Sequence, residues 1–246
     1  MKKSIFKICS GLLLAAGLTG CGALDSMISN EQVSNADNNQ VVTVGDSIFA
    51  LSGEIQDVLE EKAGETFRQY TLSGAYLEGG IISEMSVPEQ FDLAVSHDPN
   101  IKTLIMDAAG NDILVSAILG DFKNCKTQWY QFGRLSSRCK NQINDLYVLA
   151  VNFLNDVDDA GVENVIQLGY YHTKNALLLL DSLEEAVDYG DKKLAQACAN
   201  STANCTFVDP RSAIVNSDII IDGIHPADSG SEKLANLIWP VLEPLL

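Results

Sequence analysis

The stretch VVTVGDSIFALSG at residues 41–53 changes from one kind of secondary structure to another within three residues. Residues 41–44 are β-branched and mostly apolar, which is typical of a buried strand. Gly45 ends this run, and Asp46 and Ser47 precede a second apolar stretch that favours a helix. Such a turn has two interpretations: either Asp46 or Ser47 caps the helix, or Ser47 is presented as a nucleophile.

The same alternation continues along the chain. Further strands are predicted at residues 67–72, 103–106, 165–168 and 206–208, and helices at 49–62, 78–94, 112–119, 138–160, 176–199 and 229–245. Strands that alternate with helices predict a parallel sheet with helices on both faces. We see no internal repeat and no second composition regime, so one α/β domain is expected over residues 40–246.

Four short polar segments lie where the predicted strands end. They are GDS at 45–47, SGA at 73–75, AGND at 109–112 and DGIHP at 222–226, the last of these preceding the final helix. In open parallel sheets, ligands bind at the carboxyl ends of the strands. We therefore expect the four segments to meet at one edge of the sheet.

Together these segments contain the parts of an acyl-transfer site. Ser47 is the candidate nucleophile, His225 the base and Asp222 the acid that orients the imidazole. The backbone N–H groups of Ser47 and Gly74, with the Asn111 side chain, are candidates for the oxyanion hole. Each segment alone has a simpler interpretation as a helix cap or a turn. If Asp46 provides the cap, the Ser47 hydroxyl is left for His225.

The four blocks VGDSI (44–48), LSGA (72–75), AGND (109–112) and DGIHP (222–226) resemble those of the SGNH, or GDSL-type, hydrolases. The family's four residues map onto Ser47, Gly74, Asn111 and His225, with Asp222 completing the triad. The resemblance spans about residues 41–240. It implies a flavodoxin-like three-layer α/β/α sandwich with a five-stranded parallel sheet, serine esterase or lipase activity, and no metal or other cofactor.

The chain departs from the family pattern in places. Thr71 stands where Asn is frequent, so Gly79 and Gly80 compete with Gly74, although both lie farther from the strand end. Ala109 stands where Gly is common, and Ile48 where Leu is common. The G-x-S-x-G turn of the α/β-hydrolases is absent.

Two other histidines are candidates for a role in the site. His97 lies in SHDPN and is expected in a loop. His172 follows the fourth predicted strand and, with Tyr170 and Tyr171, is a candidate for the substrate pocket, the alternative being a surface position. Neither histidine has an Asp three residues earlier, so His225 is the preferred base.

The substrate class stays open at this stage. The resemblance implies an ester of an acyl lipid, a small ester or an acetylated glycan. The alternatives are an acetylesterase acting on polysaccharide, an acyltransferase with the same triad, and a non-catalytic envelope-binding lipoprotein.

The N-terminus is typical of an exported protein. Lysines at positions 2, 3 and 7 precede a short apolar run, as in a signal peptide. Residues 18–21 (LTGC) resemble a lipobox, which implies a lipoprotein signal peptide at 1–20, acylation of Cys21 and a lipid-anchored protein of the bacterial envelope. By resemblance to Gram-negative sorting, we expect the outer membrane, on its periplasmic or exposed side. The alternative is a plain signal peptide. Residues 21–39 are expected to be a flexible tether.

Charge and cysteine content agree with this location. The formal net charge of −17 disfavours binding to nucleic acid or to anionic lipid. Four cysteines remain after Cys9 and Cys21, an even number that indicates disulfides in an oxidising compartment. Of three connectivities, Cys125–Cys139 and Cys198–Cys205 close the shortest loops. Neither pair has the spacing of a metal site.

Overall fold

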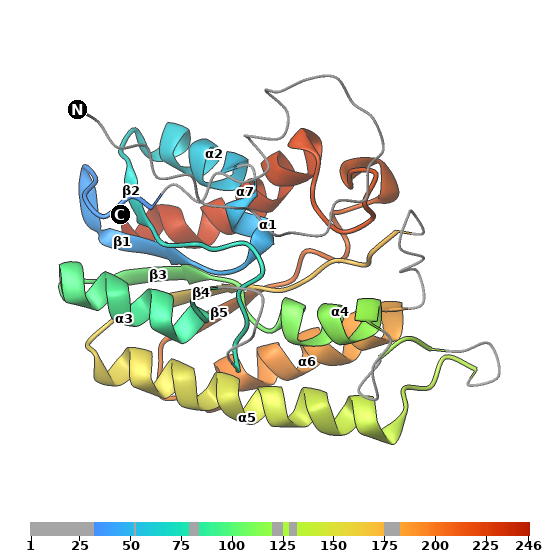
Figure 1. Cartoon of the computed structure of the whole chain (residues 1–246). Coiled ribbons are helices and arrows are strands. Elements are labelled where there is room, and N and C mark those ends of the chain that lie inside the picture. The colour runs from blue at the N-terminus through green and yellow to red at the C-terminus, as the bar shows by residue number, and fades with distance from the viewer. Residues whose placement is uncertain (1–31, 52, 79–83, 120–124, 128–131, 175–182) are drawn as a thin grey trace, which may run out of the picture.

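The computed structural model describes residues 32–246 except 52, 79–83, 120–124, 128–131 and 175–182. Five strands form one parallel sheet in the order β2-β1-β3-β4-β5. The strands are β1 (Asn38–Val44), β2 (Phe67–Gln69), β3 (Thr103–Met106), β4 (Asn164–Leu168) and β5 (Cys205–Val208). Because all five run in the same direction, their carboxyl ends share one edge of the sheet (Figure 1).

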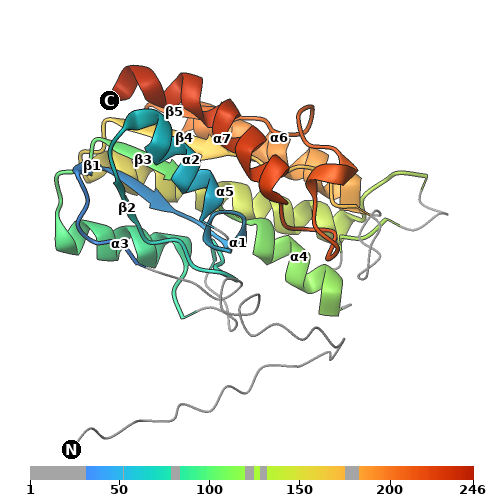
Figure 2. The same cartoon turned by 90° about the horizontal axis from the view of Figure 1, so that it is seen from above.

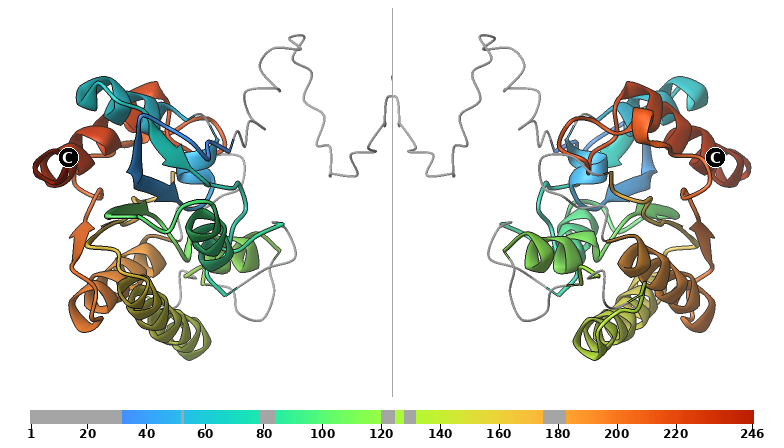
Figure 3. Two further views of the ribbon diagram at one scale, coloured as in Figure 1. Left: turned by 90° about the vertical axis from the view of Figure 1, so that its left-hand side faces the viewer. Right: turned by 90° about the vertical axis from the view of Figure 1, so that its right-hand side faces the viewer.

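Helices cover both faces of the sheet (Figure 3). On one face lie α1 (Ser47–Ala50), α2 (Glu54–Ala63) and α7 (Asp228–Leu242), and on the other α3 (Val87–His97), α4 (Gly110–Leu119), α5 (Ser137–Asp159) and α6 (Glu184–Asn200). Two short 3₁₀ helices, η3 (Asn216–Asp218) and η4 (Glu243–Leu245), flank α7. This is the predicted three-layer α/β/α sandwich, and the prediction of fold class is confirmed.

The strand sequences explain the two-sided core. Successive residues of β3 alternate between the faces, so Leu104 packs with the α3, α5 and α6 side and Ile105 with the α2 and α7 side. Both side chains are fully buried. Burial on both faces is why the central strands are continuous apolar runs rather than alternating ones.

The predicted elements agree with the structure except at some ends. The helix predicted at 49–62 is two helices, α1 and α2, because Gly53 adopts a left-handed φ of 71° between them. The helix predicted at 78–94 begins only at Val87, where Ser86 and Glu89 form a reciprocal capping box. β2 ends at Gln69 rather than at residue 72. The predicted start of the 176–199 helix lies outside the described residues.

The domain begins earlier than residue 40. β1 starts at Asn38, and Val33 forms an antiparallel bridge with Gln69, its N–H donating to the Gln69 carbonyl at 3.0 Å. β2 is an edge strand, and an edge offers unpaired backbone groups to any neighbouring segment. Residues 33–39 of the predicted tether are therefore attached to the sheet (Figure 2).

Both short-loop disulfides are present. Cys125–Cys139 joins the segment after α4 to the first turn of α5, and Cys198–Cys205 joins the end of α6 to the start of β5. In the described part of the chain, no helix combines the length and apolar character needed to cross a membrane.

Candidate active site

The turn after β1 is held from two sides. Gly45 has a φ of 148°, and a Cβ atom there would lie 2.0 Å from Oδ1 of Asp107, so only glycine fits. The side-chain amide of Gln90 on α3 accepts a hydrogen bond from the Gly45 N–H at 2.8 Å and donates one to its carbonyl at 3.1 Å. These contacts fix the backbone just before Ser47.

Asp46 is the helix cap in this turn. Its Oδ1 accepts a hydrogen bond from the Ile48 N–H at 3.0 Å, and Ser47 is the first residue of α1. Of the two residues considered as caps, Asp46 provides the cap. The Ser47 hydroxyl is directed to a histidine instead.

That histidine comes from the opposite end of the chain. His225 Nε2 lies 2.9 Å from Ser47 Oγ, and His225 Nδ1 lies 2.5 Å from Asp222 Oδ2. The other Asp222 oxygen accepts hydrogen bonds from the N–H groups of Ile224 and His225. Burial acts to raise the pKa of Asp222, but the hydrogen bonds from His225 and Ile224 outweigh it and the pKa is lowered. Asp222 is therefore ionised next to the imidazole.

A closed loop carries this acid and base. Ile219 and Pro226 form an antiparallel bridge, and the Ile220 N–H donates to the His225 carbonyl at 2.9 Å. Gly223 adopts a left-handed φ of 87° at the tip, and the Tyr171 hydroxyl donates to the Ile224 carbonyl at 2.7 Å. The loop is thus tied to itself and to the segment after β4.

The oxyanion-hole candidates come from adjacent segments. Asn111 is buried near the start of α4, and its Nδ2 donates to the Ala75 carbonyl at 3.0 Å. Gly74 precedes Ala75 and has a left-handed φ of 80°. One of the two N–H donors of the Asn111 amide is used in this bond, so the amide has a second donor for a ligand. The competing Gly79 and Gly80 lie outside the described residues.

A buried polar cluster lies next to the turn that carries Ser47. The Tyr170 hydroxyl donates to Asp46 Oδ2 at 2.9 Å and accepts from the Gly110 N–H at 3.0 Å. The Asp46 N–H in turn donates to Asp107 at 2.6 Å. Burial, together with the charge of Asp46, holds the pKa of Asp107 well above its ordinary value.

Sequence reasoning missed two residues of this support. Gln90 is a buried polar residue in an otherwise apolar helix face, and Asp107 directly follows an apolar strand. Both positions carried a signal, since a buried polar side chain in such a place needs a specific partner. Their partners could not be read from the sequence.

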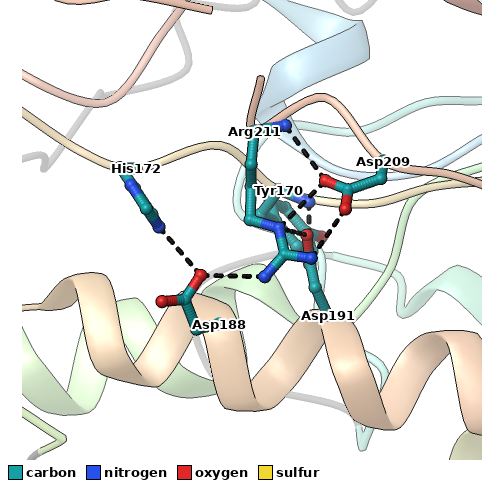
Figure 4. A network of polar contacts seen from close by, with 6 residues as sticks. All are labelled: Tyr170, His172, Asp188, Asp191, Asp209 and Arg211. Atoms are coloured by element: carbon teal, nitrogen blue, oxygen red, sulfur yellow. Dashed lines mark hydrogen bonds and ion pairs between the residues drawn. The ribbon is translucent and has the colours of Figure 1, made fainter. Parts of the chain in front are cut away.

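The other two histidines lie outside the triad. His97 is not in a loop: it is the last residue of α3, and its Nδ1 is 2.8 Å from the Tyr70 hydroxyl. His172 is partly exposed, and its Nε2 is 3.0 Å from Asp188 on α6 (Figure 4). That contact directs His172 to the surface, whereas Tyr170 and Tyr171 line a cavity beside Ser47. Of the three predicted pocket residues, the two tyrosines are at the cavity and His172 is not.

This cavity has a volume of about 90 Å³ and extends from Ser47 and Asn111 into the layer formed by α4, α5 and α6. Its wall is formed largely by Leu, Ile, Val, Ala and Tyr side chains. In the described part of the chain, no group of three or more His, Cys, Asp or Glu side chains is arranged to hold a metal ion.

Comparison with known proteins gives a result at the level of structure only. No family model matches the sequence, and no curated protein matches it. Among solved structures, an acetylxylan esterase from Geobacillus stearothermophilus superimposes with a TM-score of 0.58 at 12% identity, covering 85% of this chain and 95% of that one. A carbohydrate esterase of family 3 from Talaromyces cellulolyticus gives 0.58 at 16%, covering 83% and 96%. A lipolytic protein of the G-D-S-L family from Veillonella parvula gives 0.57 at 15%, covering 82% and 97%.

The fold is accordingly that of the SGNH, or GDSL-type, esterases. The superpositions cover most of each chain, so the likeness concerns the whole sandwich rather than one motif.

Proposed function

We propose that this protein is a serine ester hydrolase in which Ser47, His225 and Asp222 form the catalytic triad. His225 takes the proton of Ser47 as the hydroxyl attacks the ester carbonyl, and then gives that proton to the leaving alkoxide. A water molecule, deprotonated by the same imidazole, then hydrolyses the acyl-enzyme, which releases the acid and restores the Ser47 hydroxyl.

The observation that carries the proposal is the contact between Ser47 and His225, 178 residues apart in sequence. If Ser47 were only part of a helix cap or a turn, nothing would require a distant segment to place His225 and Asp222 in a hydrogen-bonded series with it. That order, with distances of 2.9 Å and 2.5 Å, is the one in which a carboxylate orients a base and the base activates a nucleophile.

For the oxyanion, we propose the backbone N–H groups of Ser47 and Gly74 and the side chain of Asn111. The Asn111–Ala75 bond fixes the amide against the segment that carries Gly74. Donors held in place before the reaction stabilise the developing negative charge without reorganisation.

Replacing Ser47 by Ala tests the proposal. We expect hydrolysis of p-nitrophenyl acetate and p-nitrophenyl hexanoate to fall by about 10³-fold or more, because the nucleophile is removed. Ser96→Ala, at an exposed serine on α3, is the matched control and should retain wild-type rates. A fluorophosphonate probe should label the wild-type protein and not the Ser47→Ala variant. Undiminished turnover in Ser47→Ala would contradict the assignment.

We also propose that the protein is exported and held at the bacterial envelope by lipid on Cys21. The support is the lipobox-like sequence at 18–21 together with the two disulfides, which belong to an oxidising compartment.

A further inference from the structure

The cavity beside Ser47 points to the acyl half of the substrate. We propose that it binds the hydrocarbon chain of an ester whose acyl group has about six carbons or more, so that acetyl esters are poor substrates. This inference rests on the proposed function and specifies its substrate class.

The position of the cavity assigns it to the acyl group. Ser47 and Asn111 are both part of its wall, so an acyl group on the Ser47 oxygen would have its chain directed into it. From there the cavity passes between Ile113 on α4, Leu146 on α5 and Leu194 on α6.

Several polar residues at the cavity have partners inside the protein. The carboxylate of Asp191 accepts from the Tyr170 N–H at 2.9 Å, and that of Asp46 accepts from Ile48 and Tyr170. The ammonium of Lys193 lies over the rings of Tyr147 and Tyr189, at 5.1 and 5.6 Å from their centroids. What these residues leave for a ligand is mostly hydrocarbon surface, which favours an alkyl chain over a sugar.

The size of the cavity sets the chain length. A volume of about 90 Å³ is at least about six times the ~10–15 Å³ that one group of the size of a water molecule needs. This leaves room for an acyl group of about six carbons or more. An acetyl group would leave most of the cavity empty.

The Cys125–Cys139 disulfide packs against one wall of the cavity. Cys125 and Cys139 form a separate hydrophobic cluster with Ile143, Leu183 and Ala186, and these last three residues also line the cavity. A wall fixed by a disulfide keeps its shape without a ligand, as expected for a pre-formed binding site.

Gly190 provides the means to test the proposal. It lies inside α6, where glycine lowers helix stability relative to alanine, and it lines the cavity. A Cβ atom at this position would meet only Cδ1 of Ile113, at an ordinary contact distance of 3.9 Å. The backbone therefore accepts a side chain here, and a large one would fill the cavity.

The experiment compares acetyl and hexanoyl p-nitrophenyl esters. For the wild-type protein, kcat/KM should rise by about fourfold per added methylene until the cavity is full. Gly190→Leu should reduce the hexanoyl-to-acetyl ratio of kcat/KM by at least about tenfold. Gly190→Ala, which adds only a Cβ, should keep the hexanoyl preference.

A wild-type preference for acetyl, or a ratio unchanged in Gly190→Leu, would overturn the acyl pocket while leaving the esterase intact. Calorimetric binding of the hexanoyl ester to Ser47→Ala separates the two proposals further. One combination of results would overturn the proposed function and support the pocket. In it, the hexanoyl ester binds, Gly190→Leu abolishes that binding, and the wild-type protein shows no hydrolysis that depends on Ser47. Absence of binding to Ser47→Ala would overturn the pocket.

Discussion

At the scale of single residues, Tyr170 connects the turn that carries Ser47 to the segment that carries Asn111. Its hydroxyl donates to Asp46 and accepts from the N–H of Gly110, the residue before Asn111. Burial and the neighbouring charge of Asp46 raise the pKa of Tyr170 well above its ordinary value, so the hydroxyl stays protonated and can donate. We therefore regard Tyr170 as a positioning residue.

Tyr170→Phe should leave Asp46 and Gly110 with unmade hydrogen bonds. We expect a loss of about 1–3 kcal/mol in the free energy of unfolding, measured with urea. Because the turn and α4 lose their common contact, kcat should fall by about tenfold with KM nearly unchanged. Tyr189→Phe, which loses only a bond to Asn144, is the matched control. A loss of stability with unchanged kcat would show that Tyr170 is structural only.

At the scale of elements, α6 is attached to the sheet through a buried acid. Asp191 accepts from the Tyr170 N–H and lies 3.5 Å from Nε of Arg211, which also binds Asp188 and Asp209 (Figure 4). Burial raises the pKa of Asp191 to about 7, although the Tyr170 N–H and the charge of Arg211 act to lower it. This attachment should make the stability of the protein depend on pH.

The native state holds a proton on Asp191 between pH 4 and 7, where the unfolded chain has released it. The contribution of this proton to the free energy of unfolding is therefore complete below about pH 4 and is lost as the pH rises to about 7. Relative to Asp191→Asn, the wild-type protein should lose about 2 kcal/mol in its free energy of unfolding between pH 5 and pH 8.

The matched control is Asp188→Asn. Partial burial acts to raise the pKa of Asp188, but the contacts with His172 and Arg211 lower it, so Asp188 is already ionised throughout this range. In urea unfolding between pH 5 and pH 8, the difference in free energy of unfolding from wild type should stay constant for Asp188→Asn. For Asp191→Asn, the same difference should change with pH. Parallel curves for the wild type and Asp191→Asn would contradict the assignment.

At the scale of the whole molecule, the proposed anchor makes a prediction for the cell. Cys21→Ser should move the protein from the membrane fraction to the soluble fraction, because the acylated thiol is lost. Cys9→Ser is the matched control, since Cys9 lies in the segment that cleavage before Cys21 would remove. Membrane association that persists in Cys21→Ser would refute lipidation.

The sequence by itself determined the fold class, the sheet strands and the residues of the candidate triad. Apolar runs such as residues 103–106 become strands wherever they are buried. The seryl turn, the amide and the Asp-x-x-His segment could each be an ordinary cap or turn, and only their combination and order along the chain resemble the SGNH blocks. Both signals can be read from the sequence. The helices predicted at 49–62 and 78–94 had wrong limits, because the left-handed Gly53 divides the first and the cap before Val87 starts the second. Such features depend on single residues rather than on a periodic pattern.

Only the tertiary structure decided what supports and surrounds those residues. Gln90 binds the Gly45 peptide, Asp107 leaves no space for a side chain at Gly45, and Asp191 joins α6 to the segment after β4. The cavity beside Ser47 is lined by residues from α4, α5 and α6, which are far apart in the sequence. Such contacts depend on which faces meet across the sheet and at what distance, and a one-dimensional pattern of polar and apolar residues does not specify that.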